Sequence, residues 1–544
     1  MTNNQLKEIL KQIKKYDLIN LFDDMKEINR WVEGLNEKQI HNFLSLTIIV
    51  EINSYVKSEI LDKDLLNSDY YLEDMELILN AKRKIEYYLA IVAVNKDSLS
   101  SEHHRSDMKL IADARTDAIA SRLAKVATDK DSLSSEHHKK DMKLIADART
   151  DAIAQYLSNV AIDKNSLSSE YHREDMKLVA DARTDEIASR LAKVAADKDS
   201  LSSEYHREDM KLVADAKTYA IAQFLSNVAI DKNSLSSEYH REDMELIANA
   251  KEKAIAGALM IVAVAENSLA SIHHHADMAL ITNTSVSEIA TELREVATSP
   301  NSLSSVHHRE DMELIANTKT RLRAMSLCEV AKDYYSLSTS YHREDMKLIA
   351  NSKIDDNFIN RVMWLACDRN SLSSEHHKAD MELIAKIDTS DLDMDLHIRT
   401  NNTNSIDDLV DVARSSISLS NKHHREDMEL IANANNKTAL IRNYLIRMAS
   451  NEEFLLSANY RKNMELMASA KTDAQAKFYM LIIKAANLFA KKEQRLQEES
   501  VLQNSYQLLE DNLNTIIKQL EEDKEEQELS EYSLNLILKD NKRE

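Results

Sequence analysis

The sequence contains almost no glycine or proline: among 544 residues there are two glycines, Gly34 and Gly257, and one proline, Pro300. Hairpin turns, glycine-rich phosphate-binding loops and strand-rich folds need far more of both residues. By contrast, Ala, Leu, Ile, Met, Lys and Glu are abundant, and these residues lose little conformational freedom in a helix. The composition therefore predicts helices joined by short turns.

Cysteine is equally scarce, since only Cys328 and Cys367 are present. Two cysteines exclude a disulfide framework and favour thiols in a reducing compartment. The first eighteen residues are polar and amphipathic without an apolar signal-peptide core, and no uninterrupted apolar run approaches the length of a membrane span. We therefore expect a cytoplasmic, intracellular protein with no membrane partner.

The formal net charge is −22 and the sequence pI is near 5.4. This balance disfavours broad binding to a phosphate backbone, which requires clustered Lys and Arg. Part of the acidity belongs to the C-terminal tail, so a local basic stripe elsewhere stays compatible with the composition. Nucleic acid is thus the less favoured partner.

A repeated segment dominates the sequence and indicates a repeat architecture. The segment at 98–114, SLSSEHHRSDMKLIADA, recurs with small changes, and the Met of its Asp-Met pair marks each copy. The spacing between markers is 34 residues through most of the array and 47 between Met381 and Met428. The markers are Met75, Met108, Met142, Met176, Met210, Met244, Met278, Met312, Met346, Met381, Met428 and, in a degenerate copy, Met464.

Each copy predicts two helices, here called helix A and helix B. Helix A covers about 100–114, with an apolar stripe of His104, Met108 and Ile111, and helix B covers about 116–128. The segment between helix B and the next helix A, DKDSLS, predicts a turn whose Asp and Ser cap that helix. A break between A and B is supported by Ser285 and Glu288, which have capping-box spacing, and by an insertion near 388–405 at the same joint.

One helical hairpin cannot bury its own apolar stripe, but stacked hairpins can. The sequence therefore predicts an all-α fold, a right-handed-type α-solenoid of about twelve two-helix repeats. We expect a helical N-terminal cap at 1–63, the repeats at 64–490, and an acidic helical or coiled-coil tail at 491–544. In the tail, apolar residues alternate four and three apart, which predicts a helix that either dimerises through 496–520 or folds back on the array. They are Leu502, Tyr506, Leu509, Leu513, Ile516 and Leu520.

The 34-residue hairpin period resembles that of tetratricopeptide-like α-solenoids across about 64–490. The resemblance is one of layout only, because the tetratricopeptide pattern of Trp, Leu-Gly, Tyr, Ala and Pro is missing, and no named family is matched. The resemblance implies protein binding along an extended face.

Histidine and aspartate recur in the repeats, and ten of the nineteen histidines stand four residues before a marker Met. Equivalent histidines one helix-packing distance apart, about 9–10 Å, are too far apart to share a metal ion. We interpret them as structural, with His104 hydrogen-bonded to Asp107 three residues later, and HHH at 273–275 is only a weak metal candidate. With no phosphate loop or nucleophile motif, we expect no enzyme activity, no catalytic residue, no metal site and no cofactor.

Two positions on one face of helix B differ between copies that are otherwise nearly identical. They alternate between Arg with Lys and an aromatic residue with Asn, and Arg, Tyr and Phe are enriched at interface centres. We interpret this face as a binding surface; the other interpretation is that it is solvated or that the aromatic residues pack between repeats. The candidate residues are Arg122, Lys125, Tyr156, Asn159, Arg190, Lys193, Phe224 and Asn227.

The sequence thus favours a non-enzymatic scaffold that binds another protein through an extended repeat face. Two alternatives remain at this point. One is a repeat-type nucleic-acid-binding protein, and the other is a structural protein that self-assembles through its tail.

Overall fold

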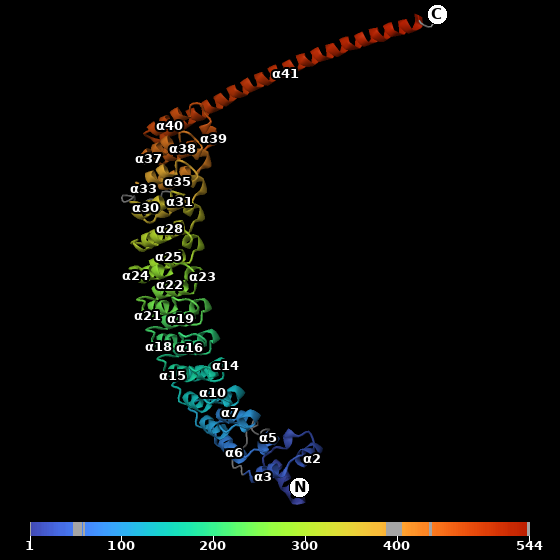
Figure 1. The fold of residues 1–544 in the computed structure, drawn as a ribbon, viewed down its shortest axis with the longest axis vertical. Coiled ribbons are helices and arrows are strands. Elements are labelled where there is room, and N and C mark those ends of the chain that lie inside the picture. Colours follow the sequence, from blue (N-terminus) through green and yellow to red (C-terminus); the bar gives the residue numbers. More distant parts are fainter. Residues whose placement is uncertain (1, 47–56, 58–59, 388–404, 435–437, 541–544) are drawn as a thin grey trace. The chain divides into compact units, whose positions relative to one another are not determined.

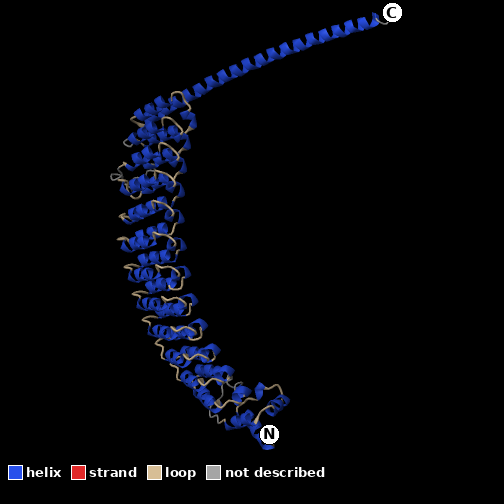
Figure 2. Ribbon diagram, viewed as in Figure 1, coloured by secondary structure: helices blue, strands red, loops and turns tan. Residues whose placement is uncertain are grey.

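The computed structural model describes residues 2–46, 57, 60–387, 405–434 and 438–540, and every regular element in these ranges is a helix (Figures 1 and 2). The helices repeat with the period of the sequence, which confirms the all-α solenoid. The chain divides into two compact units, Met1–Leu337 and Ser338–Glu544, and each is described by itself.

Helix A carries the Asp-Met marker in every repeat but the last, where Asn precedes the Met, and is nine or ten residues long. Its apolar stripe is buried as predicted, since His104, Met108 and Ile111 are all inaccessible to solvent. The twelve copies are α6 (Tyr71–Asn80), α9 (His104–Ala112), α12 (His138–Ala146), α15 (His172–Asp181), α18 (His206–Asp215), α21 (His240–Asn249), α24 (His274–Asn283), α27 (His308–Ala316), α30 (His342–Asn351), α33 (His377–Ala385), α37 (His424–Asn433) and α40 (Tyr460–Ser469).

Helix B follows helix A after a short joint, which confirms the predicted break. In the second repeat the break spans 113–116, and the hydroxyl of Thr116 accepts a hydrogen bond from the backbone N–H of Ile119 at 3.1 Å. The copies are α7 (Arg83–Ala93), α10 (Asp117–Ala127), α13 (Asp151–Val160), α16 (Asp185–Ala195), α19 (Tyr219–Val228), α22 (Lys253–Val264), α25 (Ser287–Ala297), α28 (Arg321–Lys332), α31 (Ile359–Ala366), α35 (Ser405–Arg414) and α38 (Ala439–Ala449).

A third, four-residue helix stands where the sequence predicts a turn. A single helical turn is too short to show a period, so it cannot be recognised from the pattern. The copies are α5 (Lys63–Leu66), α8 (Lys96–Leu99), α11 (Lys130–Leu133), α14 (Lys164–Leu167), α17 (Lys198–Leu201), α20 (Lys232–Leu235), α23 (Glu266–Leu269), α26 (Pro300–Leu303), α29 (Tyr334–Leu337), α32 (Arg369–Leu372), α36 (Ser416–Leu419) and α39 (Glu452–Leu455).

Two capping predictions are wrong. The aspartate after helix B caps the short helix rather than helix A, because the carboxylate of Asp129 accepts from the N–H of Ser132 at 2.8 Å. Helix A instead starts without a side-chain cap, directly after the bend that follows the short helix. The capping box at Ser285 and Glu288 does not form either, since α25 begins at Ser287 after an uncapped Val286.

In the first unit the repeats follow one another in three columns (Figure 1). Helix B forms the central column: α10 contacts α9 of its own repeat, α7 and α13 in the neighbouring repeats, and α12 of the next. Helices A contact their neighbours along one side, and the short helices contact theirs along the other. The buried residues Ile119, Leu123 and Val126 lie between these columns, and the predicted stripe of helix B is confirmed.

Among the residues that the structure describes, the elements before the repeats include α1 (Asn3–Lys15), η1 (Ile19–Leu21), α2 (Met25–Glu33) and α3 (Glu37–Ser45). Helix α3 contacts α5 and α6 of the first repeat. The region 1–63 is therefore helical, as the sequence predicts, where the structure describes it.

The second unit ends in one long helix, α41 (Asp473–Asp540), which contacts α38 and α40 and whose Lys491 donates to Glu453 of α39 at 2.7 Å. It runs without a break through residue 490, where the sequence places the start of the tail. The insertion predicted near 388–405 lies almost entirely outside the described residues. Among the described helices, none is long and apolar enough to cross a membrane.

Candidate binding surfaces

A buried histidine in each of nine repeats is held from both sides. Its ring atom Nε2 lies 2.8–2.9 Å from an aspartate oxygen of the preceding repeat, and Nδ1 lies 2.8–3.0 Å from a serine hydroxyl of its own short helix. We call these groups the ladder. Its histidines are His104, His138, His172, His206, His240, His274, His308, His377 and His424.

An aromatic ring completes each step of the ladder. Against each ladder histidine lies a His or Tyr ring of the preceding repeat. This ring belongs to the residue five positions before the marker Met of that preceding repeat. For example, the ring centroids of Tyr171 and His206 are 4.9 Å apart, and those of His103 and His138 are also 4.9 Å apart. Each such interface between repeats therefore contains both a hydrogen bond between histidine and aspartate and a contact between two rings.

The geometry corrects the predicted partner of the histidine. His104 bonds to Asp74 of the preceding repeat, whereas Asp107 bonds to His138 of the following one. Although Asp107 and His104 lie on the same face of α9, the carboxylate of Asp107 bonds to the histidine of the next repeat instead of its own. The structural interpretation of the histidines is supported, but the bond links repeats rather than residues within one helix.

The ladder combines serine, histidine and aspartate, yet its surroundings are those of a scaffold. A carboxylate accepts the Nε2–H, so a neutral ring takes the hydroxyl hydrogen of serine at Nδ1. The histidine and serine side chains are inaccessible to solvent, and burial raises the pKa of Asp74, Asp209 and Asp243. A substrate cannot reach a hydroxyl that is buried at every step.

The two ends of the array depart from the ladder. In the first repeat, Tyr71 and Leu65 replace the histidine and the serine, and no earlier repeat offers an aspartate. In the last repeat, Tyr460 replaces the histidine and donates its hydroxyl to Asp427 at 2.5 Å, while Asn463 stands in place of the aspartate. The sequence thus encodes where the ladder starts and stops.

The candidate metal cluster at 273–275 is divided among different partners. His274 belongs to the ladder, the ring of His273 lies against His308, and His275 lies 3.0 Å from Glu242. Over the described part of the chain, no group of three or more His, Cys, Asp or Glu side chains could hold a metal ion. Cys328 is buried in α28, where burial raises its pKa to about 12, which fits a packing role.

The predicted helix-B residues lie along α10, α13, α16 and α19, and we call them the helix-B ridge. Several contact each other across repeats: Lys125 donates to Asn159 at 3.1 Å, and Lys193 donates to Asn227 at 3.4 Å. A Cβ added to Gly257 would lie 3.3 Å from the ring of Phe224, so this aromatic residue does contact the next repeat. The remaining three, Arg122, Arg190 and Tyr156, are half-buried, and the two arginines donate to Gln155 and Tyr219.

No protein-family model and no curated protein matches the chain. The absence of a family match agrees with the prediction that the chain matches no named family.

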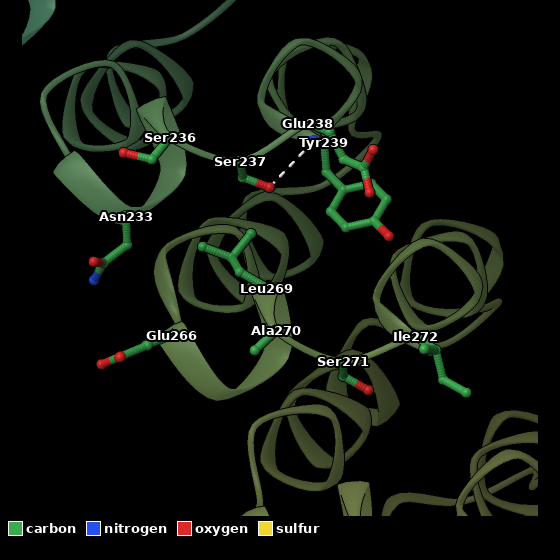
Figure 3. A pocket seen from close by; sticks show the side chains of 10 residues that line it. All are labelled: Asn233, Ser236, Ser237, Glu238, Tyr239, Glu266, Leu269, Ala270, Ser271 and Ile272. Carbon is green, nitrogen blue, oxygen red and sulfur yellow. Dashed lines mark hydrogen bonds between the residues drawn. The ribbon is translucent and has the colours of Figure 1, made fainter.

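Shallow grooves run along the column of short helices between neighbouring repeats. In the groove shown in Figure 3, Leu269, Ala270, Ser271 and Ile272 lie across from the segment 236–239 of the preceding repeat. Its volume is about 640 Å³. The outermost residue of this rim stands six positions before the marker Met and is Glu in half of the twelve repeats. The side chains of Glu102 and Glu136, for example, are 87% exposed.

Two neighbouring repeats replace this glutamate with apolar residues. Ile272 is 89% exposed and Val306 is 93% exposed, although both are β-branched hydrocarbons. The sequence prediction missed Ile272 and Val306, because it compared the copies only at two positions of helix B. The signal is present in the sequence, since aligning the copies at the position of Glu238 shows the loss of charge in consecutive repeats.

The outer face of helix A carries a set of bases in the early repeats. Lys140, Lys143, Arg173 and Lys177 line a cavity of about 350 Å³ between α12 and α15, but Asp147 and Asp181 line it too. Such alternation of charge weakens the attraction for a phosphate backbone, which favours a continuous basic stripe. This face therefore lacks the continuous basic stripe that a phosphate backbone favours.

Proposed function

We propose that this chain is a non-enzymatic scaffold that binds other proteins through surfaces repeated along the array. The observation that carries the proposal is a separation of roles. The ladder groups, which join repeats, are buried and nearly the same at each step, whereas residues of the helix-B ridge and of the groove rims differ between copies. A surface that varies on a fixed scaffold is typical of a binding protein rather than an enzyme.

We expect charge reversal on the helix-B ridge to weaken the capture of a partner at least tenfold. Arg122→Glu with Arg190→Glu places acids where the ridge alternates basic and aromatic side chains, and interface centres tolerate such changes poorly. Capture by full-length protein is measured by quantitative co-purification from lysate, with circular dichroism to confirm unchanged helicity. Arg173→Glu with Lys211→Glu changes net charge equally on helix A and is the control; equal loss in both variants contradicts the ridge assignment.

A second candidate function, self-assembly through the tail, is favoured by one observation. On α41, Leu508, Leu509 and Leu513 have 65%, 63% and 57% of their surface exposed. Leu509 and Leu513 belong to the predicted heptad seam, and a helix in water normally covers such a seam with another helix. The side chains of Leu502, Tyr506, Ile516 and Leu520 lie outside the part described.

If the tail dimerises, Leu509→Glu with Leu513→Glu should halve the mass of the full-length protein in light scattering, because two charges would enter the apolar seam. Glu510→Lys lies on the same helix beside the seam and is the control that should keep the mass unchanged. A monomeric mass for the unaltered chain would contradict this candidate and leave the scaffold proposal intact.

A further inference from the structure

Three successive grooves on the short-helix column lose their charged residues step by step. The groove between α17 and α20 is lined by Asp199, Glu204, Lys232 and Glu238 among its ten residues. The next groove, between α20 and α23, retains only two carboxylates, Glu238 and Glu266 (Figure 3). In the third, between α23 and α26, Asp, Glu, Lys and Arg are all missing from the lining.

The third groove, of about 770 Å³, is also bounded by the two exposed apolar residues. Ile272 stands on one rim and Val306 on the other, with Ala270, Pro300 and Leu303 also in the lining. Both side chains are about nine-tenths exposed, so covering these hydrocarbons with a partner would lower the free energy of the system. Exposed apolar clusters of this kind mark interaction sites. Here two of them line one groove without charged residues.

The groove also offers hydrogen-bond donors in its lining. The hydroxyl oxygens of Ser271 and Ser305 each accept the backbone N–H of the residue two positions later, at 3.1 Å. Each hydroxyl therefore keeps its own hydrogen for an outside acceptor. A backbone carbonyl of an extended peptide is such an acceptor, and it carries no charge that the groove would have to match.

His273 is the one titratable side chain in the lining of this groove. Burial lowers the pKa of His273, and the neighbouring His308 lowers it further. Asp277 and Arg309 are the charged groups that act on it from α24 and α27. With no Asp, Glu, Lys or Arg in its lining, the groove is suited to an uncharged occupant.

We propose that the groove between Ile272 and Val306 binds an extended, uncharged apolar peptide segment of a partner protein. The inference rests on the proposed scaffold function and names the kind of segment that the scaffold takes. Successive repeats are about 9–10 Å apart, and three residues of a polyproline-type chain advance by about 9 Å. Apolar side chains three positions apart in the peptide would then reach both rims.

The test is selection of peptides from a random phage-displayed library on the immobilised full-length protein. We expect enriched sequences with two apolar residues three apart and few charges. Affinity of a synthetic consensus peptide is then measured by calorimetry, and Ile272→Glu with Val306→Glu, which restores the residue of most other repeats, should weaken it at least tenfold. Unchanged affinity, or an enriched set rich in charge, would overturn the proposal.

The molecule supplies its own gain-of-binding control. Substituting Asp199→Asn, Glu204→Ile, Lys232→Pro and Glu238→Val gives the first groove the residues found 68 positions later. Binding should rise from one peptide per chain to two, and a stoichiometry of one would refute the role given to these residues. If Ile272→Glu with Val306→Glu instead lowers the mass in light scattering, a second copy is the occupant and the peptide proposal is wrong. A negative result for peptide binding in this groove does not affect the co-purification test of the helix-B ridge. The groove proposal and the scaffold proposal can therefore fail separately.

Discussion

Replacing His206 by alanine is expected to lower the stability of the array by about 3–5 kcal/mol at that step. The change removes the Nε2 donor 2.9 Å from Asp175, the ring that receives the hydroxyl of Ser200 at 3.0 Å, and the ring against Tyr171. Asp175 is 1% exposed, so water cannot replace the lost donor. A buried carboxylate left without its partner is among the costliest single changes in a protein.

The loss should be local at first, because each repeat contacts mainly its neighbours and stability is a sum over interfaces. Urea unfolding followed by circular dichroism should broaden or split into two transitions, and hydrogen exchange should accelerate around 171–215. Arg207→Ala changes the adjacent but exposed residue, whose pair with Glu174 lies at the surface, and should cost less than about 1 kcal/mol. A similar small cost for His206→Ala would show that the ladder does not stabilise the stack.

A double-mutant cycle separates the interaction energy of the His206–Asp175 pair from the cost of the cavity that each alanine substitution leaves. Asp175→Ala alone strands the histidine, and His206→Ala alone strands the carboxylate, so the double variant should cost clearly less than the sum of both. Additive losses would mean that the two side chains act independently despite the 2.9 Å contact.

The ladder also shows how far sequence reasoning reaches in this chain. The period, the helix pair and the buried stripe follow from recurring letters, because the same residue in each copy must occupy the same environment. Which aspartate meets which histidine does not follow. His104 lies 3 residues before Asp107 and 30 residues after Asp74. It bonds to the more distant aspartate, Asp74, because the stacking of repeats brings these two side chains together.

The candidate surfaces divide in the same way. Differences between copies locate the helix-B ridge, but they present Lys125 and Asn159 as separate contact residues although the two bond to one another. The same comparison at a further position finds Ile272 and Val306. Their near-complete exposure does not follow from it, because the letters alone do not show that the bend after the short helix turns these apolar side chains outward.

The last repeat provides a pH-dependent test of what histidine contributes. There Tyr460 takes the place of the histidine, and burial raises the pKa of Asp427 to about 6, against an ordinary value of 3.8. The hydrogen bond from Tyr460 and the nearby Arg461, His423 and His424 only partly oppose this rise. Because the folded state holds the proton more tightly than the unfolded state, the stabilisation is full below about pH 4 and is lost as the pH rises through about 6.

Asp427→Asn should remove this dependence, since an amide oxygen can still accept from Tyr460 but carries no titrating proton. The stability of the variant relative to the original chain should therefore rise by about 2–3 kcal/mol between pH 4 and pH 8, because each tenfold change in proton affinity corresponds to about 1.36 kcal/mol. Hydrogen exchange of peptides from 424–470 in the full-length protein, measured at several pH values, reports this step alone. Glu429→Gln, an exposed change on the same helix, should give a flat difference. The contrary outcome is a stability difference between Asp427→Asn and the original chain that stays constant or falls as the pH rises. That result would show that the carboxylate is already charged in the folded repeat, and that tyrosine replaces histidine at this end without a loss of stability.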